Sequence, residues 1–157
     1  MRFHHQIMSL FAVLGMLCVP MFASQAEAKT SFRRHVWPTF KRYCRSCHSS
    51  RKERKKVKGK KVKVKVPPAG GLDLSKRKIA YKSLVNQLSK QTKSEYYLVM
   101  PSQPAFSYLL LKLQGNHTKV GGKGKKCPQA KGKRKAKKIA RWRFNRIVKW
   151  IQGGAKK

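Results

Sequence analysis

The segment YCRSCH, residues 43–48, holds the pattern on which the interpretation of this sequence depends: Cys44 and Cys47 are separated by two residues, and His48 follows directly. A C-x-x-C-H string is the attachment signature of c-type haem. Two thiols about one helical turn apart can each bond a vinyl group on one edge of a porphyrin, and the adjacent histidine is then directed toward the iron. The pattern predicts one covalently attached haem c, with Cys44 and Cys47 as thioethers and His48 as the proximal iron ligand.

Two other uses of these residues compete with haem. Cys44 and Cys47 suit a structural disulfide, and together with Cys127 and one histidine they suit a zinc site. Zinc is disfavoured because the neighbouring residues Cys47 and His48 do not easily close on one tetrahedral metal. In an exported protein, haem attachment is the favoured interpretation.

The N-terminal residues explain why export is expected. Arg2 gives a basic start, residues 7–23 form a short apolar run, and residues 26–28 provide a small-x-small ending. This is the pattern of a secretory signal peptide, and the apolar run is short for a membrane-spanning helix. We expect residues 1–28 to be removed and the protein to reside in the periplasm or cell envelope of a Gram-negative bacterium. Residues 29–157 are then expected to form a single domain.

The sequence is strongly basic, with 40 Lys and Arg residues against 4 Asp and Glu and a formal net charge of +36. No domain of this size needs that charge in order to fold, so the excess concerns partners or surroundings. Two lysine-rich tracts, at about residues 51–66 and 123–138, are interpreted as loop insertions in a compact domain. The alternation of Val and Lys over residues 62–66 is compatible with a short edge strand. Because Pro67 and Pro68 end it, a solvated flexible loop is expected instead.

Apolar residues at helical spacing predict four helices outside these tracts. The first covers residues 30–44, with Thr30 or Ser31 as N-cap and a bend or restart at Pro38. The second covers residues 76–89. The residues expected to face the core are Phe32, Val36, Phe40 and Tyr43 in the first helix, and Ala80, Leu84 and Leu88 in the second.

The other two predicted helices lie in the C-terminal half. Residues 103–115 read as a helix with Pro104 near its first turn and Gly115 at its end. Residues 139–154 read as a helix that stops at Gly153 and crosses the first helix through its aromatic face. The expected core residues are Leu109, Leu110 and Leu113 in the earlier helix, and Ile139, Trp142, Ile147 and Ile151, with Phe144 and Val148 beside them, in the later one.

Five segments in a fixed order carry a resemblance to a known family. They are VWPTFKRYCRSCH (36–48), GGLDLS (70–75), PSQPAFSYLLLKLQG (101–115), GGKGKKCP (121–128) and IVKWIQGGA (147–155). This order resembles the exported cytochrome c domains of planctomycete type, which also occur in myxobacteria and related Gram-negative bacteria. The resemblance covers essentially the whole chain after the signal peptide apart from the two basic tracts. It implies an all-α, class I-like cytochrome c domain.

The resemblance also aligns Cys127 with a position that has a known role in the family. In that family the segment after the Leu-rich helix typically reads Gly-Gly-x-Gly-x-x-Met-Pro, and its methionine is the expected distal iron ligand. In this sequence Cys127 stands at the position of that methionine, which makes it the candidate distal ligand. A thiolate favours ferric iron and lowers the reduction potential, whereas a thioether raises it. Lys123, Lys125 and Lys126 are expected to favour the thiolate by their charge.

Two other residues compete for the distal position. Met100 is also followed by a proline, but it precedes the Leu-rich helix and is therefore the weaker alternative. His117 is a third candidate. An open distal site, a free thiol or an intermolecular disulfide are the remaining interpretations of Cys127.

The residue composition favours an electron carrier over an enzyme. After the signal peptide the only acidic residues are Glu53, Asp73 and Glu95, and acid–base catalysis needs titratable groups. The expected function is single-electron transfer in the cell envelope, with an acidic redox protein or an anionic envelope surface as partner. The alternative is a polyanion- or envelope-binding basic protein whose haem site is structural or vestigial. A haem peroxidase is a third interpretation, and no specific nucleic-acid fold is recognised.

Overall fold

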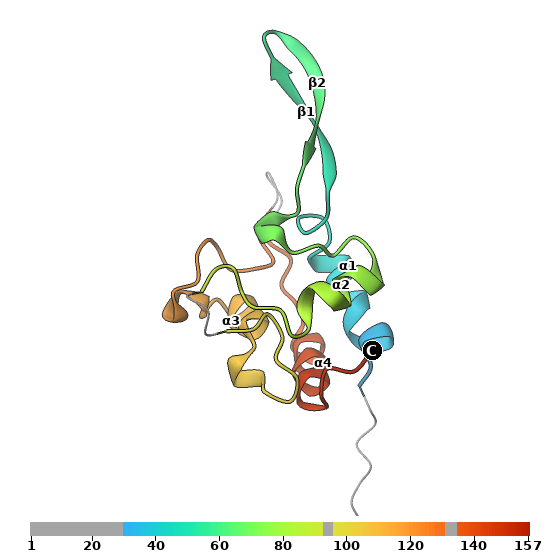
Figure 1. Cartoon of the computed structure of the whole chain (residues 1–157), viewed down its shortest axis with the longest axis vertical. Coiled ribbons are helices and arrows are strands. Elements are labelled where there is room, and N and C mark those ends of the chain that lie inside the picture. Colours follow the sequence, from blue (N-terminus) through green and yellow to red (C-terminus); the bar gives the residue numbers. More distant parts are fainter. Residues whose placement is uncertain (1–29, 93–95, 131–134) are drawn as a thin grey trace, which may run out of the picture.

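The computed structural model describes residues 30–92, 96–130 and 135–157, and the predicted signal peptide lies outside these ranges. Its elements, in chain order (Figure 1), are the π-helical turn η1 (Phe32–Val36), α1 (Trp37–Tyr43), β1 (Arg51–Val57), β2 (Lys60–Val66), the 3-10 turn η2 (Ala69–Gly71), α2 (Arg77–Leu84), the 3-10 turn η3 (Pro104–Phe106), α3 (Tyr108–Gln114), the 3-10 turn η4 (His117–Val120) and α4 (Arg141–Gln152). No helix in the described part of the chain combines the length and apolarity needed to cross a membrane.

The fold is mixed α/β, and the prediction of an all-α domain was wrong. The first basic tract forms an antiparallel hairpin, paired from Arg51 opposite Val66 to Val57 opposite Lys60. It closes through Lys58 and Gly59, which both have positive φ, at 48° and 78°. Two such residues are what a two-residue hairpin turn requires. The charge of the tract does not prevent strand formation, because paired strands satisfy the backbone while leaving the lysine side chains in water.

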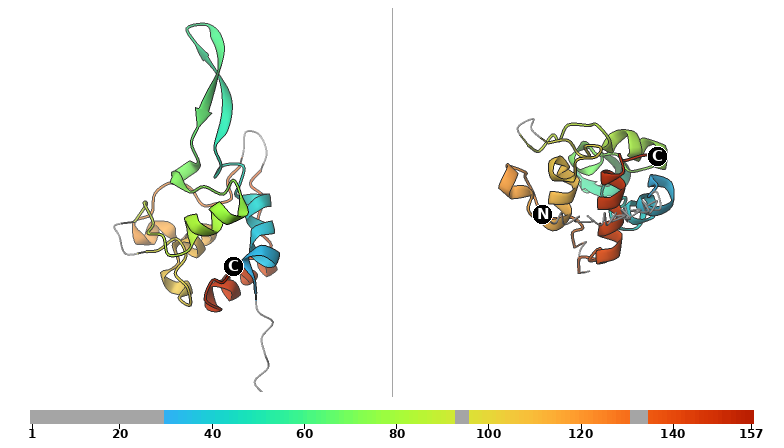
Figure 2. Two further views of the ribbon diagram at one scale, coloured as in Figure 1. Left: turned by 45° about the vertical axis from the view of Figure 1, so that its right-hand side comes forward. Right: turned by 90° about the horizontal axis from the view of Figure 1, so that it is seen from below.

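The hairpin projects from the helical body as a narrow arm, as two views show (Figures 1 and 2). The flexible loop expected for residues 51–66 is therefore an ordered element, and the strand considered for residues 62–66 is its second half. The second basic tract, where described, contains no helix or strand.

The first predicted helix exists in two parts. Ser31 caps it, because its Oγ accepts a hydrogen bond from the Arg34 N–H at 3.2 Å. The wide turn η1 precedes Pro38, which lies in the first turn of α1, where a missing N–H costs nothing. Phe32, Val36 and Phe40 are buried as predicted, while Tyr43 is half-buried.

The second helix is shorter than predicted. Ala80 and Leu84 are buried, but α2 ends at Leu84 because Val85 is extended and Asn86 has a φ of 56°. Leu88 is therefore not a core residue of this helix and is 50% exposed.

The third helix follows the prediction closely. Leu109, Leu110 and Leu113 are buried in α3, and Gly115 ends it in the left-handed conformation at φ 90°. Pro104 begins the separate turn η3 rather than the helix itself.

The helix α4 closes the domain against the N-terminal segment, as predicted. The ring centroids of Phe32 and Trp150 are 5.2 Å apart, and the Phe32 N–H and the Trp150 Nε1–H both donate to the Lys156 carbonyl, at 3.3 and 2.7 Å. The prediction that Trp142 is a core residue was wrong, however. Because the helix begins only at Arg141, Trp142 lies in its first turn and is 49% exposed, whereas Trp150 is fully buried.

Candidate functional site

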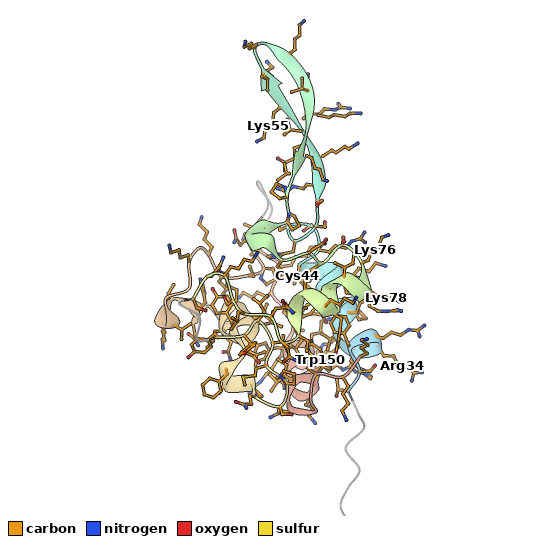
Figure 3. All side chains as sticks on the ribbon, viewed as in Figure 1. Arg34, Cys44, Lys55, Lys76, Lys78 and Trp150 are labelled. Atoms are coloured by element: carbon orange, nitrogen blue, oxygen red, sulfur yellow. The ribbon has the colours of Figure 1, made fainter. Side chains whose placement is uncertain are left out.

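The C-x-x-C-H motif forms a tight turn at the end of α1. The Cys44 N–H donates to the Phe40 carbonyl at 2.9 Å, and the N–H groups of Cys47 and His48 donate back to the Cys44 carbonyl, at 3.2 and 3.0 Å. Figure 3 shows Cys44 in the body of the protein, near the base of the hairpin. Cys44 is buried, and Cys47 is exposed.

The segment after the hairpin, residues 69–74, folds against this motif and orients His48. The Ala69 carbonyl accepts a hydrogen bond from His48 Nδ1 at 2.9 Å. Because a carbonyl oxygen only accepts, Nδ1 carries the proton and Nε2 keeps its lone pair. Histidines that bind metals usually donate their other ring N–H to a carbonyl or carboxylate in this way.

Backbone hydrogen bonds hold that segment in place. The Ala69 N–H donates to the Cys47 carbonyl at 3.0 Å, and the Leu74 N–H donates to the His48 carbonyl at 2.6 Å. Gly70 and Gly71 both have positive φ, at 61° and 71°, so the turn between these two contacts requires glycine-like conformations. This accounts for the two glycines of the GGLDLS segment.

A cavity of about 260 Å³ adjoins the motif. Its apolar lining consists mainly of leucines: Leu72, Leu74, Leu84, Leu88, Leu98, Leu109 and Leu113 line it together with Phe40. Cys44, His48 and Cys127 also line it. A second cavity of about 280 Å³ is lined by the same three residues and additionally by Cys47. The structure therefore brings the three predicted attachment residues and Cys127 to one site.

Cys127 reaches this site from the loop after η4. Its backbone N–H donates to the Lys112 carbonyl at 3.3 Å, which places the loop beside α3. Gly122 permits the close approach of this loop, because a Cβ there would collide with the Tyr108 side chain and lie 2.6 Å from the His117 carbonyl oxygen.

The thiol pKa values reflect burial in this cavity. Burial raises the pKa of Cys127, and the charge of Lys112 only partly offsets that increase. The expected lowering by Lys123, Lys125 and Lys126 is not found; the cation that acts on Cys127 is Lys112. Burial, reinforced by Cys127 and Cys47, raises the pKa of Cys44 to about 12.

Burial lowers the pKa of His48, although its hydrogen bond to the Ala69 carbonyl acts in the opposite direction. The lower pKa favours the neutral imidazole, the form that binds metals.

Sequence reasoning missed a polar group at the cavity wall. Gln91 Oε1 accepts hydrogen bonds from the Tyr108 hydroxyl at 2.8 Å and from Lys112 Nζ at 3.2 Å. Lys112 Nζ also donates to the Lys123 carbonyl at 2.6 Å. Lys112 has helical neighbours that are leucines, so its sequence context gave no sign that its head group faces the cavity.

The other two candidate distal ligands lie elsewhere. Met100 lines neither cavity, and its backbone N–H donates to Ser107 Oγ at 3.0 Å. His117 is 2% exposed, and its Nε2 pairs with the Gly124 carbonyl at 2.8 Å. Of the three candidates, only Cys127 lines the cavity that His48 lines.

The competing uses of the cysteines find no support in the geometry. Cys44, Cys47 and Cys127 are free thiols. Within residues 30–92, 96–130 and 135–157, no three His, Cys, Asp or Glu side chains are grouped so as to hold a metal ion among themselves. Haem needs less from the protein, because the porphyrin supplies four of the iron's ligands. Two free thiols, one oriented imidazole and a leucine-lined cavity fit that requirement.

Comparison with known proteins gave no match to a family model, to a curated protein or to a solved structure.

Proposed function

We propose that this protein is an exported c-type cytochrome that carries single electrons in the cell envelope and is related to the planctomycete-type cytochrome c domains. Cys44 and Cys47 hold one haem c covalently, and His48 binds its iron. The observation that carries the proposal is the orientation of His48: its Nδ1–H donates to the Ala69 carbonyl, and His48 lines one cavity together with both Cys44 and Cys47. A haem in this place supplies the one-electron redox chemistry.

The surrounding residues suit an electron carrier better than an acid–base enzyme. Leucines and Phe40 form the apolar part of the cavity wall, and apolar surroundings favour the less charged state of a bound metal. Asp73 accepts a hydrogen bond from the Ser75 N–H at 2.8 Å, and Glu53 pairs with Arg51 on the hairpin. Neither of these carboxylates lines the cavities.

Cys127 is the proposed distal ligand. It lines the same cavity as His48 and lies beside Lys112, and both observations support this role. Coordination would release the thiol proton, because metals bind the thiolate. Burial raises the pKa of the free Cys127 thiol because it desolvates the thiolate, and bonding to iron would have to offset that cost. A thiolate ligand implies a low-potential carrier.

The test is haem retention after export in a host that carries a haem-attachment system. We expect the intact mass of the purified protein to include one haem, and the denatured absorption spectrum to show a haem bonded at two thioethers. Cys47→Ala should leave a single thioether and shift that spectrum, while the neighbouring Ser46→Ala should not. A protein isolated without haem under these conditions would refute the proposal.

The proposed partner is an acidic redox protein, since the described surface carries many exposed lysines. Long-range attraction between opposite charges accelerates encounter, and salt screens it. Stopped-flow electron transfer to an acidic acceptor should therefore slow steeply between low and physiological ionic strength. A rate that does not depend on salt would contradict this choice of partner.

A further inference from the structure

The register of the hairpin separates its side chains into two unlike faces. Residues directly opposite each other share a face, and successive residues alternate between faces. One face, which we call the cationic face, consists of three opposed pairs: Lys52 with Lys65, Arg54 with Lys63, and Lys56 with Lys61. The other face, the valine face, holds Val57, Val62, Val64 and Val66 together with Arg51, Glu53, Lys55 and Lys60.

The cationic face has no internal compensation for its charge. All six of its side chains are exposed, and each stands opposite another cation. Like charges directly opposite each other destabilise a strand pair, and a two-stranded hairpin alone is marginal in water. These six residues lie on the hairpin, which projects away from the helical body (Figure 3). The arrangement therefore suits an external anion.

We propose that the cationic face binds the phosphate backbone of double-stranded nucleic acid without sequence selectivity. A two-stranded ribbon has the width that the major groove admits. Seven residues in each strand extend about 23 Å, and along that length duplex DNA presents one negative charge per about 1.7 Å. A narrow arm that carries three successive opposed pairs of cations along one face matches a polymer with regularly spaced negative charges.

A lipid bilayer fits the hairpin less well. A peripheral membrane element places apolar residues and flanking cations toward the same surface. The valine face does carry Arg51, Lys55 and Lys60 beside its valines, but the six cations of the cationic face point the opposite way, so a planar membrane that meets the valines leaves those six charges without a partner. The hairpin also contains no Trp, Tyr or Phe that would anchor it at the lipid interface.

This inference does not depend on haem, because no residue of the cationic face lines either cavity. It assigns the basic tract a role beyond electron transfer. In a protein that does both, the arm holds the redox centre close to the polymer.

The experiment compares two variants of the whole protein that lose the same charge in different places. Lys56→Gln/Lys61→Gln/Lys63→Gln removes three cations from the cationic face. Arg34→Gln/Lys76→Gln/Lys78→Gln removes three exposed cations from the body (Figure 3). Fluorescence anisotropy with a labelled mixed-sequence duplex gives the binding constant between 50 and 300 mM salt, and far-UV circular dichroism verifies that both variants fold.

For the cationic-face variant we expect the slope of log Kobs against log salt to become shallower by about 2.7, which is three phosphate contacts at about 0.9 each. The affinity at about 150 mM salt should fall at least tenfold. The body variant should change the slope by less than 1. Equal losses in both variants would overturn the inference, because binding would then follow net charge alone.

A second arm tests the choice of polymer. The unmodified protein and the cationic-face variant are each titrated with the duplex, with an anionic polysaccharide and with phosphatidylserine-containing vesicles at equal charge concentration. We expect the cationic-face variant to lose more affinity for the duplex than for either competitor. A larger loss with the vesicles or the polysaccharide would assign the face to that partner and overturn the nucleic-acid assignment.

Discussion

At the scale of single residues, Cys127 is the position on which the proposed distal ligation depends. It lines both cavities with Cys44 and His48, and Met100 lines neither. A thioether ligand at the same place would favour ferrous iron where a thiolate favours ferric iron.

We therefore expect Cys127→Met to raise the reduction potential of the haem-loaded protein by on the order of 0.1 V or more, within the roughly 0.8 V that axial ligands span. Cys127→Ala should change the ferric absorption spectrum. Potentiometric titration and the ferric spectrum measure these effects, with Met100→Leu as the matched control. A ferric spectrum that Cys127→Ala leaves unchanged would exclude Cys127 as a ligand.

The Cys44 thiol gives a pH-dependent prediction for the haem-free protein. Its pKa rises from the ordinary 9.0 to about 12 on folding, so the folded state holds its proton more tightly than the unfolded state. The resulting stabilisation is complete below about pH 9 and is lost as the pH rises from 9 toward 12. Over that window its contribution to the free energy of unfolding should fall by about 1.4 kcal/mol per pH unit.

Urea unfolding at a series of pH values measures this loss. Because lysines also titrate in the same window, the quantity to compare is the difference between the unmodified haem-free protein and Cys44→Ala. The dependence of that difference on pH should vanish once haem is attached, since a thioether has no proton to lose. Parallel pH profiles for the two haem-free proteins would show that burial of Cys44 does not control its titration.

At the scale of elements, the hairpin is the feature whose stability is set by cross-strand charge. Arg54 faces Lys63, whereas Lys60 faces Val57. Replacing one cation of an opposed pair by an acid converts repulsion into attraction, which is worth about 0.2–1 kcal/mol for a directly opposed pair.

Lys63→Glu should therefore slow amide hydrogen exchange in β1 and β2 by up to about fivefold, the equivalent of that free energy. Lys60→Glu makes the same change in net charge without an opposed partner and should slow it less. Exchange followed by NMR compares the two variants. Equal protection in both would mean that total charge, rather than cross-strand pairing, governs the hairpin.

Helix boundaries show which local signals suffice and which do not. The caps Ser31 and Gly115 act where the sequence predicts them, because a cap uses only neighbouring backbone groups. The end of α2 at Leu84 was missed, since no Gly or Pro marks it. Val85 instead pairs with Val99, a contact between segments distant in sequence.

At the scale of the whole molecule, the contact between the two chain ends closes the core. Trp150 packs on Phe32 and is fully buried, while Trp142 in the same helix is 49% exposed and lies beneath the guanidinium groups of Arg143 and Arg146, at 4.2 and 4.7 Å. These two tryptophans form a natural pair for comparison.

Trp150→Ala should lower the free energy of unfolding by about 3–5 kcal/mol, because it removes a fully buried aromatic side chain and leaves a cavity. Trp142→Ala should cost about 1 kcal/mol or less, mostly from lost cation–π contacts. Urea unfolding of both variants in the same haem state makes the comparison. A similar cost for both would contradict the closure of the core by α4 and Phe32.

The sequence by itself determined the positions of the helices, their caps and most of their buried residues. Spacing of apolar residues is a local property, so Val36, Phe40, Leu109 and Ile147 were assigned correctly to the core. The sequence also predicted that Cys44, Cys47 and His48 lie close together, because residues within a stretch of five cannot be far apart.

Only the tertiary structure decided which distant groups meet. The Ala69 carbonyl on His48, the cation Lys112 beside Cys127, and the choice between Trp142 and Trp150 depend on chain segments that lie far apart in sequence. The hairpin was decided in the same way, since its two strands pair across a turn and the charge of neither strand predicts that pairing. Local pattern fixes which face of a segment is apolar, but long-range contacts fix what that face meets.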